Sequence, residues 1–274
     1  MVVFPHAKIN LGLRITGRRE DGYHNVQTLF YPIPLHDVLE ILENKQPDAP
    51  PLEFRLTGND LPNAPGTNLC EKAFHLIKAL HPQIPPTVLH LHKAIPAGGG
   101  MGGGSSDGTF TLQLLNSYYR LGINEDMLHN LSLELGSDCP FFLKNQPCIG
   151  TGRGEQLQPV DFNLKGYALV VINPGLSVST AEAFKMLKQF SEPVDLEHII
   201  RQSPDNWKNT LVNDFETPVF AVHPVLKHIK DTLYESGAVY ASLSGTGSTL
   251  YGIFKEQKPL PGLASSGYFV KWVE

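Results

Sequence analysis

IPAGGGMGGGSSDG, residues 95–108, places six glycines in seven positions directly before two serines and an aspartate. A flexible linker is the simplest alternative, but linkers are seldom embedded between an alternating strand pattern (87–92) and a helical apolar pattern that ends at Gly122. Ordering so many glycines also carries a high entropic cost. The run therefore predicts an ordered loop in which nearly bare backbone has a function.

Three kinds of glycine-rich loop fit this run to different degrees. A Walker A loop needs Lys after its last glycine, whereas Gly104 is followed by Ser105. Residues 98–103 satisfy G-x-G-x-x-G, yet the preceding segment is polar and residues 116–120 hold no acid where a dinucleotide fold needs one. In a phosphate nest, N–H groups of residues with positive φ converge on an anion at the N-terminus of a helix. Because residues 105–107 are suited to open such a helix, we predict a phosphate-binding loop.

Composition limits the classes of partner. The chain has 274 residues, 41% of them hydrophobic, which is enough for two domains. Its net charge of −5 and its lack of a basic cluster argue against nucleic acid or an anionic membrane as a partner. Cys70, Cys139 and Cys148 form no C-x-x-C pair, so neither a disulfide framework nor a zinc site is predicted. No apolar stretch is long enough for a membrane span or a secretory signal. We expect a cytoplasmic protein.

The first half of the chain begins with an alternating strand pattern. Apolar and polar residues alternate over 7–16, which predicts a half-buried strand with Lys8 and Asn10 pointing in the same direction. Asp21–Gly22 is a turn signal that places Tyr23 and His24 at the start of the next strand.

Helices and further strands follow in a mixed order. Asn68 is a suitable N-cap for a helix over 69–80, and a helix over 125–135 is expected to stop at Gly136. A loop-rich segment at 150–166 suggests a boundary that divides the chain into domains 1–152 and 153–274. The second half predicts a strand at 167–172, a helix at 181–190, helices around 196–230 and three final strands. The fold class is α+β, with antiparallel strands and helices packed on one face of the second domain.

The glycine run also carries a resemblance. The spacing P-x-x-x-G-x-G-G-G-S-S-D, from Pro96 to Asp107, resembles the second motif of the GHMP kinases, the family of galactokinase, homoserine kinase, mevalonate kinase and phosphomevalonate kinase. Four further segments are similar, in order, to the branch of that family that uses ATP to phosphorylate the 2-hydroxyl of a CDP-linked methylerythritol in the non-mevalonate pathway to isoprenoid precursors. They are PHAKINLGLRITGRREDGYHNVQTLF (5–30), ELGSDCPFF (134–142), NPGLSVSTAEAF (173–184) and LSGTGSTLYGIF (243–254). The resemblance implies a two-domain GHMP kinase fold, with an N-terminal domain like ribosomal protein S5 domain 2 and a ferredoxin-like C-terminal domain.

Two residues are implied to carry the chemistry. Asp138 precedes Cys139–Pro140, and from local sequence alone an N-cap role is as plausible as a catalytic one. Lys8, taken alone, is a solvated lysine on a strand. The resemblance implies instead that Asp138 accepts the proton of the attacking hydroxyl, while Lys8 keeps that carboxylate ionised and neutralises charge on the transferred group.

The resemblance further implies the binding residues. ATP is expected to bind Asn68, Lys93, Pro96, Ala97, Gly98, Gly99, Gly100, Met101, Gly102, Gly103, Gly104, Ser105, Ser106, Gly245 and Thr246, and the acceptor is expected to bind Asn10, Tyr23, His24, Asp138, Thr180 and Phe184. Tyr23 and Phe184 would stack on the two faces of the cytosine, although ordinary core packing is an open alternative for both. Gly245–Gly247, the third family motif, could also be a simple hairpin turn. Mg²⁺ is expected with ATP, with no dedicated metal site on the protein, and the chain is expected to be a monomer or a weak homodimer.

Two other functions are alternatives, and the sequence departs from the family pattern at one place. Another GHMP kinase, acting on homoserine or mevalonate, is the second choice, and an RNA-binding module of S5-like fold is the third. Gly108–Thr109 stand where the family commonly has two alanines, and glycine just inside a helix costs about 1 kcal/mol relative to alanine. A looser helix start is therefore predicted.

Overall fold

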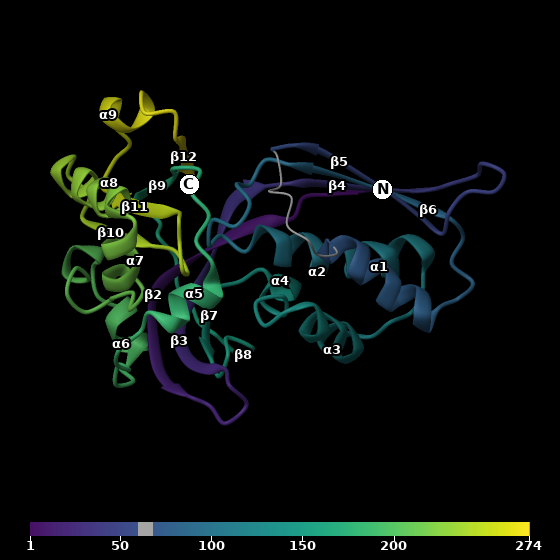
Figure 1. Ribbon diagram of the computed structural model, residues 1–274, viewed down its shortest axis with the longest axis horizontal. Helices are drawn as coiled ribbons and strands as arrows, with labels where there is room; N and C mark the ends of the chain where they lie inside the picture. Colours follow the sequence, from purple (N-terminus) through teal and green to yellow (C-terminus); the bar gives the residue numbers. More distant parts are fainter. Residues whose placement is uncertain (60–67, 274) are drawn as a thin grey trace. The chain divides into compact units, whose positions relative to one another are not determined.

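The computed structural model describes residues 1–59 and 68–273, which divide into two compact units (Figure 1). Unit 1 comprises Met1–Ala7, Leu35–Ala97 and Gly102–Asn145, and unit 2 comprises Lys8–Pro34, Gly98–Met101 and Gln146–Glu274. Residues 8–34 thus belong to the same unit as the C-terminal half of the chain. A boundary between residues 152 and 153 stays a prediction.

Unit 1 is a four-stranded sheet with helices. The strands follow the order β1 (Val2–Val3), β4 (Val38–Glu43), β6 (Thr87–Lys93), β5 (Leu52–Gly58), and β5 runs parallel to β6 while the other neighbours are antiparallel. The helices are α1 (Leu69–Leu80), α2 (Gly103–Tyr119), α3 (Glu125–Leu135) and α4 (Phe141–Lys144). Apolar side chains of β4, β6, α1, α2 and α3 form one core. The predicted helices over 69–80 and 125–135 are confirmed.

Helix α2, which begins in the glycine run, packs closely on α1. A Cβ atom at Gly108 would lie 2.8 Å from Leu69 Cβ and 3.2 Å from Leu135 Cδ1. Real Cβ atoms do not approach that closely, so glycine at this position permits the contact between the helices. The helix is continuous from Gly103 to Tyr119, and the looser start that we expected is not observed.

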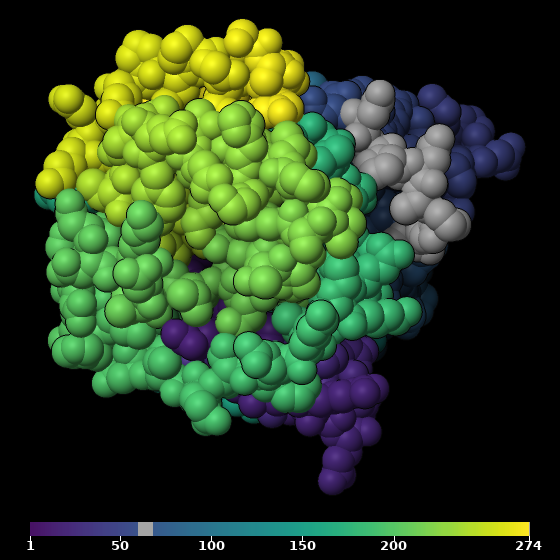
Figure 2. All heavy atoms as spheres, turned by 60° about the vertical axis from the view of Figure 1, so that its left-hand side comes forward, coloured from purple at the N-terminus to yellow at the C-terminus, as the bar shows by residue number. Residues whose placement is uncertain are grey.

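Unit 2 contains two sheets, and the first holds the long N-terminal hairpin. Its strand order is β2 (His6–Arg18), β3 (His24–His36), β7 (Cys148–Thr151), β8 (Gln156–Pro159). The turn at Asp21–Gly22 is confirmed, with Gly22 at φ +83°, and the tip of the hairpin projects as the purple finger in Figure 2. The segment 150–166, which we expected to be loop-rich, contributes strand β8 to this sheet.

The second sheet of unit 2 is antiparallel throughout. Its order is β10 (Tyr240–Leu243), β11 (Leu250–Phe254), β9 (Ala168–Asn173), β12 (Phe269–Val273). Helices α7 (Glu216–Val222) and α8 (Pro224–Glu235) share a core with these strands (Figure 1). The other helices are α5 (Thr180–Lys185), α6 (Leu196–Ile200), the 3₁₀ helix η1 (Pro204–Asn206) and α9 (Pro261–Ala264).

Helix α5 is shorter than the sequence predicts. The expected helix over 181–190 ends at Lys185. The following chain leaves the helical path, and the Ser191 N–H donates to the Ile15 carbonyl of β2 at 2.8 Å. A tertiary hydrogen bond thus competes with local helix propensity. In the described part of the chain, no helix has the length and apolar character needed to cross a membrane.

Candidate active site

In the glycine run, every second residue from Gly98 to Gly102 has a positive φ angle. Gly98, Gly100 and Gly102 have φ of +64°, +78° and +67°, and Gly102 is the N-cap of α2 with no side chain capping the helix. Left-handed residues at alternate positions before an uncapped helix N-terminus are the conformation that an anion-binding nest requires. The predicted positive φ angles are confirmed. The helix begins at Gly103 rather than at residues 105–107 as predicted, and the binding of phosphate stays a prediction.

The first turns of α2 carry buried polar atoms. Ser106 Oγ and Asp107 Oδ1 lie below the surface and have no hydrogen-bond partner among the described residues. The other oxygen of Asp107, Oδ2, accepts a hydrogen bond from Lys93 Nζ at 2.7 Å. The first turns of α2 are therefore bound to the end of strand β6 within unit 1.

Lys93 is held by two aspartates rather than exposed. Its side chain is 2% exposed, and its ammonium also donates to Asp37 Oδ2. Asp37 Oδ1 accepts the N–H groups of Ala94 and Ile95 at 2.6 and 2.9 Å. Burial raises the pKa of Asp107 and the Asp37 carboxylate acts in the same direction, against the lowering by Lys93. This ion triad fixes the start of the glycine run, and contact of Lys93 with ATP stays a prediction.

Asn68 and Asp138 belong to the same unit. The Asn68 side chain caps α1 by accepting the Cys70 N–H at 2.8 Å, as predicted. Asp138 lies in the turn after α3, and the N-cap of α4 is Pro140, so the N-cap interpretation of Asp138 is wrong. Thr109 of α2 donates to the Cys139 carbonyl at 3.0 Å, which ties the turn that carries Asp138 to the helix of the glycine run.

Cys139, next to Asp138 in this turn, has a raised pKa. Burial raises its pKa to about 11, and the neighbouring Asp138 carboxylate contributes in the same direction. The raised pKa favours the neutral thiol at neutral pH, and the thiol is a weaker nucleophile than the thiolate.

In unit 2, Lys8 and Asn10 form a buried pair on β2. Each is 3% exposed, and Lys8 Nζ donates to Asn10 Oδ1 at 2.6 Å and approaches the Gly100 carbonyl at 3.4 Å. The two side chains do point in the same direction, but the expectation of a half-buried strand is wrong, and so is that of a solvated lysine. The polar face is covered, since the Lys8 ammonium approaches the Gly100 carbonyl and Asn10 Nδ2 donates to Thr28 Oγ1 at 3.0 Å. The backbone is bonded as well, with the Lys8 N–H donating to the Met101 carbonyl at 2.9 Å and the Asn10 N–H to Ser244 Oγ at 3.2 Å.

The segment that carries the third family motif, Gly245–Gly247, contacts Asn10 and Gly100 through Ser244. Ser244 Oγ donates to the Gly100 carbonyl at 2.8 Å, and a Cβ atom at Gly100 would overlap the Ser244 carbonyl oxygen. The hydroxyl oxygens of Thr246 and Thr180 are 3.3 Å apart. Unit 2 therefore brings together residues predicted for ATP and for the acceptor, and the turn also joins β10 to β11 as the hairpin alternative expects.

The aromatic residues predicted to hold the cytosine make other contacts in the described structure. His24 stacks on Phe184 with ring centroids 4.6 Å apart and planes at 22°, and burial lowers the pKa of His24. Tyr23 is 54% exposed and faces the Arg153 guanidinium at 4.9 Å. A cytosine site between Tyr23 and Phe184 stays a prediction. The contact of Arg153 with Tyr23 was not predicted from the sequence, in which Arg153 stands between two glycines at 152 and 154.

The cavity found in unit 2 is lined by residues other than the predicted site residues. It has a volume of about 600 Å³ and is lined by Tyr31, residues 163–169, Lys255 and Gln257. Among residues 1–59 and 68–273, no three His, Cys, Asp or Glu side chains are grouped so that they could hold a metal ion.

Comparison with known families gives two matches along the chain. Residues 68–146 match the N-terminal domain of the GHMP kinases, and residues 186–265 match the C-terminal domain of the same family. Together these segments cover more than half of the chain.

Individual relatives extend the similarity over nearly the whole length. The 4-diphosphocytidyl-2-C-methyl-D-erythritol kinase of Parabacteroides distasonis is 46% identical over 256 residues, covering 93% of this chain and 92% of the relative. The protein of the same name from Bacteroides fragilis is 44% identical over 263 residues, with 95% and 94% covered. That of Porphyromonas gingivalis is 40% identical over 274 residues, with 99% and 98% covered.

Solved structures show the same fold. A crystal structure of 4-(cytidine 5'-diphospho)-2C-methyl-D-erythritol kinase superposes with a TM-score of 0.81 at 29% identity, covering 100% of this chain and 99% of the other. The homoserine kinase of Cytophaga hutchinsonii gives a TM-score of 0.69 at 12% identity, with 98% and 94% covered. At that identity the second likeness shows the fold alone. The predicted two-domain α+β fold is confirmed.

Proposed function

Because the chain belongs to the GHMP kinases, and within them to the 4-diphosphocytidyl-2-C-methyl-D-erythritol kinases, we propose that it transfers the γ-phosphoryl group of ATP to the 2-hydroxyl of that CDP-linked alcohol. The observation that carries the proposal is 46% identity over 93% of the chain. Similarity at that level and length supports a shared substrate, whereas the likeness to homoserine kinase rests on 12% identity.

Phosphoryl transfer requires positioning, stabilisation of charge and an acceptor for the proton of the attacking hydroxyl. The backbone N–H groups of residues 98–106 bind the phosphates, supported by the left-handed glycines and the uncapped α2. Asp138 accepts the proton, and Lys8 stabilises negative charge on the transferred group. Burial strengthens this last effect, because a charge that is 3% exposed is weakly screened by solvent.

Apart from Asp138, the proposed acceptor contacts come from unit 2. Tyr23 and Phe184 stack on the cytosine, His24 bonds the edge of the base, and Asn10 and Thr180 lie near the methylerythritol. The contact between Thr180 and Thr246 supports this assignment, because it joins an acceptor residue to the motif proposed to close over ATP. Stacking contributes about 1–3 kcal/mol per base in single-stranded nucleic-acid sites, which is enough to select a cytidylyl substrate.

ATP enters as its Mg²⁺ complex, in which the ion neutralises phosphate charge. Asn68 and Lys93 border the nucleoside, and Gly245 and Thr246 close the site. The enzyme acts in the cytoplasm as a monomer or weak homodimer, in the non-mevalonate pathway to isoprenoid precursors. The three cysteines, all free and buried, are compatible with a reducing compartment.

The test is ADP release by the purified protein with Mg-ATP and each of three acceptors. We expect turnover with 4-diphosphocytidyl-2-C-methyl-D-erythritol and none above background with homoserine or mevalonate. Turnover with one of the latter alone would contradict the proposed substrate while retaining the family. RNA binding that falls steeply with salt, without ADP release, would instead support the RNA-binding alternative.

A further inference from the structure

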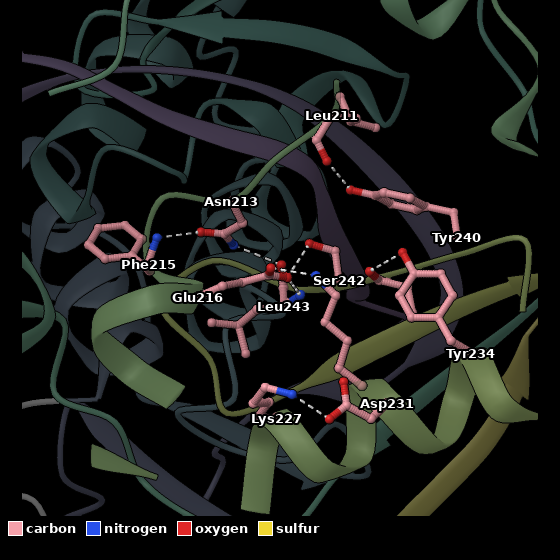
Figure 3. Close-up of polar contacts among 12 residues, drawn as sticks. Leu211, Asn213, Phe215, Glu216, Lys227, Asp231, Tyr234, Tyr240, Ser242 and Leu243 are labelled. Atoms are coloured by element: carbon pink, nitrogen blue, oxygen red, sulfur yellow. Dashed lines mark hydrogen bonds and ion pairs between the residues drawn. The ribbon is translucent and has the colours of Figure 1, made fainter. Parts of the chain in front are cut away.

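A buried asparagine, Asn213, donates hydrogen bonds to the backbone at the third family motif. Asn213, 4% exposed, donates from Nδ2 to the Leu243 carbonyl at 2.8 Å and accepts the Phe215 N–H on Oδ1 at 2.9 Å (Figure 3). Its Nδ2 also donates to the Gly245 carbonyl at 2.9 Å. Both of its donor hydrogens and its acceptor oxygen are used. Gly245 has φ +58°, so the amide fixes the backbone where it enters a left-handed turn.

Glu216 holds the preceding strand. Its Oε1 accepts hydrogen bonds from Ser242 Oγ at 2.8 Å and from the Leu243 N–H at 3.0 Å (Figure 3). Its other oxygen accepts a hydrogen bond from Lys230 of α8. The end of β10, where the turn over residues 244–249 begins, is therefore bonded from both Asn213 and Glu216.

Residues 212–216, the segment that carries Asn213 and Glu216, are also bonded to β2, the strand that carries Lys8 and Asn10. The Leu13 N–H donates to the Val212 carbonyl and the Asp214 N–H to the Leu13 carbonyl, each at 2.8 Å. Asp214 Oδ2 accepts the Ile15 N–H at 2.7 Å. Residues 212–216 thus attach to both the turn and the strand within unit 2.

The turn and the strand meet at Ser244. This residue accepts the Asn10 N–H at 3.2 Å and donates to the Gly100 carbonyl at 2.8 Å, and Asn10 Oδ1 accepts the Lys8 ammonium. A continuous series of hydrogen bonds and one peptide link therefore runs from Asn213 through Gly245, Ser244 and Asn10 to Lys8.

We propose that Asn213 is a positioning residue for phosphoryl transfer, which holds the 244–249 turn so that Ser244, Asn10 and Lys8 keep their reactive arrangement. This inference rests on the proposed function. An aspartate at position 213 keeps the shape and the acceptor for Phe215. It removes both donors and sets a carboxylate oxygen against two carbonyl oxygens, so the turn must move away.

The test compares Asn213→Asp with a matched control, Asn116→Asp. Asn116 also bonds backbone through its amide, donating to the Ile123 carbonyl at 2.9 Å and accepting the Ile123 N–H at 3.0 Å. We expect Asn213→Asp to lower kcat by about tenfold or more, because small misplacements of reacting groups are costly. The KM of the CDP-linked acceptor should change by a smaller factor. Asn116→Asp should lower Tm and leave kcat unchanged.

A double-variant cycle with Ser244→Ala separates positioning from general destabilisation. If Asn213 acts through the turn, Asn213→Asp and Ser244→Ala together lower kcat by less than the product of their separate losses. Multiplying losses, or an unchanged kcat in Asn213→Asp, would overturn the inference. If Asn213→Asp does not fold, Asn213→Ala, which removes both donors without adding a charge, takes its place in the same cycle, and the same outcomes support or overturn the inference.

The unaltered enzyme distinguishes the two proposals. If it fails to release ADP with the CDP-linked acceptor, the proposed function is wrong and this inference falls with it. If it does release ADP and Asn213→Asp does so at the same kcat, the inference alone is wrong.

Discussion

The ammonium of Lys8 donates a hydrogen bond to the side-chain oxygen of Asn10 at 2.6 Å, two residues further along strand β2. Asn10 is itself fixed, since its Nδ2 donates to Thr28 Oγ1 at 3.0 Å. The Lys8 ammonium also lies 5.2 Å from the centre of the Phe30 ring. Lys8 is therefore held in one place by its strand neighbours before any substrate binds.

Replacing Asn10 with alanine removes the nearest oxygen from a buried ammonium. A hydrogen bond to a charged group contributes about 1.5–3 kcal/mol, so kcat should fall by about tenfold to a hundredfold. Asn10→Asp keeps an oxygen for Lys8 and should lose less. The measurement is kcat for ADP release, taken separately from the KM of the acceptor. Equal kcat in the alanine variant and the unaltered enzyme would show that Lys8 does not depend on Asn10.

Asp138→Asn tests the proposed proton acceptor. The amide keeps the shape of the side chain but cannot take the proton of the attacking hydroxyl, and general base catalysis contributes about 10²–10⁴-fold. We expect kcat to fall within that range while the Kd for ATP, measured by titration, stays near its original value.

Asp126→Asn is the control for this change of charge. Asp126 is exposed in the first turn of α3, the helix that leads to Asp138, and it has no proposed role in the reaction. Its substitution should leave kcat unaltered. A folded Asp138→Asn enzyme with ordinary kcat would place the proton acceptor elsewhere.

Local sequence predicted the direction of Lys8 and Asn10 but not their burial. Alternation along a strand places residues i and i+2 on one face, and this depends only on the strand itself. Whether that face meets solvent depends on distant segments such as Gly100, whose carbonyl lies 3.4 Å from Lys8 Nζ although it is 92 residues away along the chain. A pattern read within one strand contains no information about such a contact.

The ion pair between Lys93 and Asp37 could not be predicted from the sequence either, because the two residues are far apart along the chain. Asp37 and Lys93 are 56 residues apart, and neither belongs to a motif that pairs them. The turn geometry of Gly98 and Gly100 was predictable, because glycine tolerates positive φ at little steric cost. Local conformation could thus be predicted at the glycine run, whereas the partners of its charged neighbour could not.

Tyr23→Ala tests the proposed cytosine site. The loss of an aromatic face should raise the KM of the CDP-linked acceptor by about fivefold to a hundredfold, as expected for 1–3 kcal/mol of stacking, with a smaller effect on the KM of ATP. Tyr23→Phe keeps the ring, including its contact with the Arg153 guanidinium, and should keep the KM. An unaltered KM in Tyr23→Ala would mean that the base binds away from this ring.

Two glycines of α2 should respond in opposite ways to alanine. At Gly108 the added Cβ would lie 2.8 Å from Leu69 Cβ, and overpacking costs about 1–3 kcal/mol, more than the gain in helix propensity of about 1 kcal/mol. At Gly104 the added Cβ meets no described atom within 4 Å. Urea unfolding should therefore show Gly108→Ala destabilised and Gly104→Ala equal or more stable. A stabilised Gly108→Ala protein would contradict the close packing of α1 on α2.

His6 should make stability depend on pH. It is 3% exposed among the rings of Phe110, Phe141 and Phe142, its Nε2 has no partner among the described residues, and burial lowers its pKa from 6.5 to about 4, aided by His36. The unfolded chain takes up the proton below pH 6.5 while the folded protein resists it. The stabilisation by neutral His6 is therefore complete above pH 6.5 and is lost as pH falls toward 4.

His6→Leu removes this titration and keeps an apolar side chain in the pocket. Between pH 7 and pH 5 the free energy of unfolding should fall by about 2 kcal/mol more in the unaltered protein than in His6→Leu. Because carboxylates titrate alike in both proteins, their contribution cancels in this difference, and so does the packing cost of the substitution. Urea unfolding at the two pH values measures it. Parallel losses of stability in the two proteins would mean that His6 is protonated as readily in the folded state as in the unfolded chain.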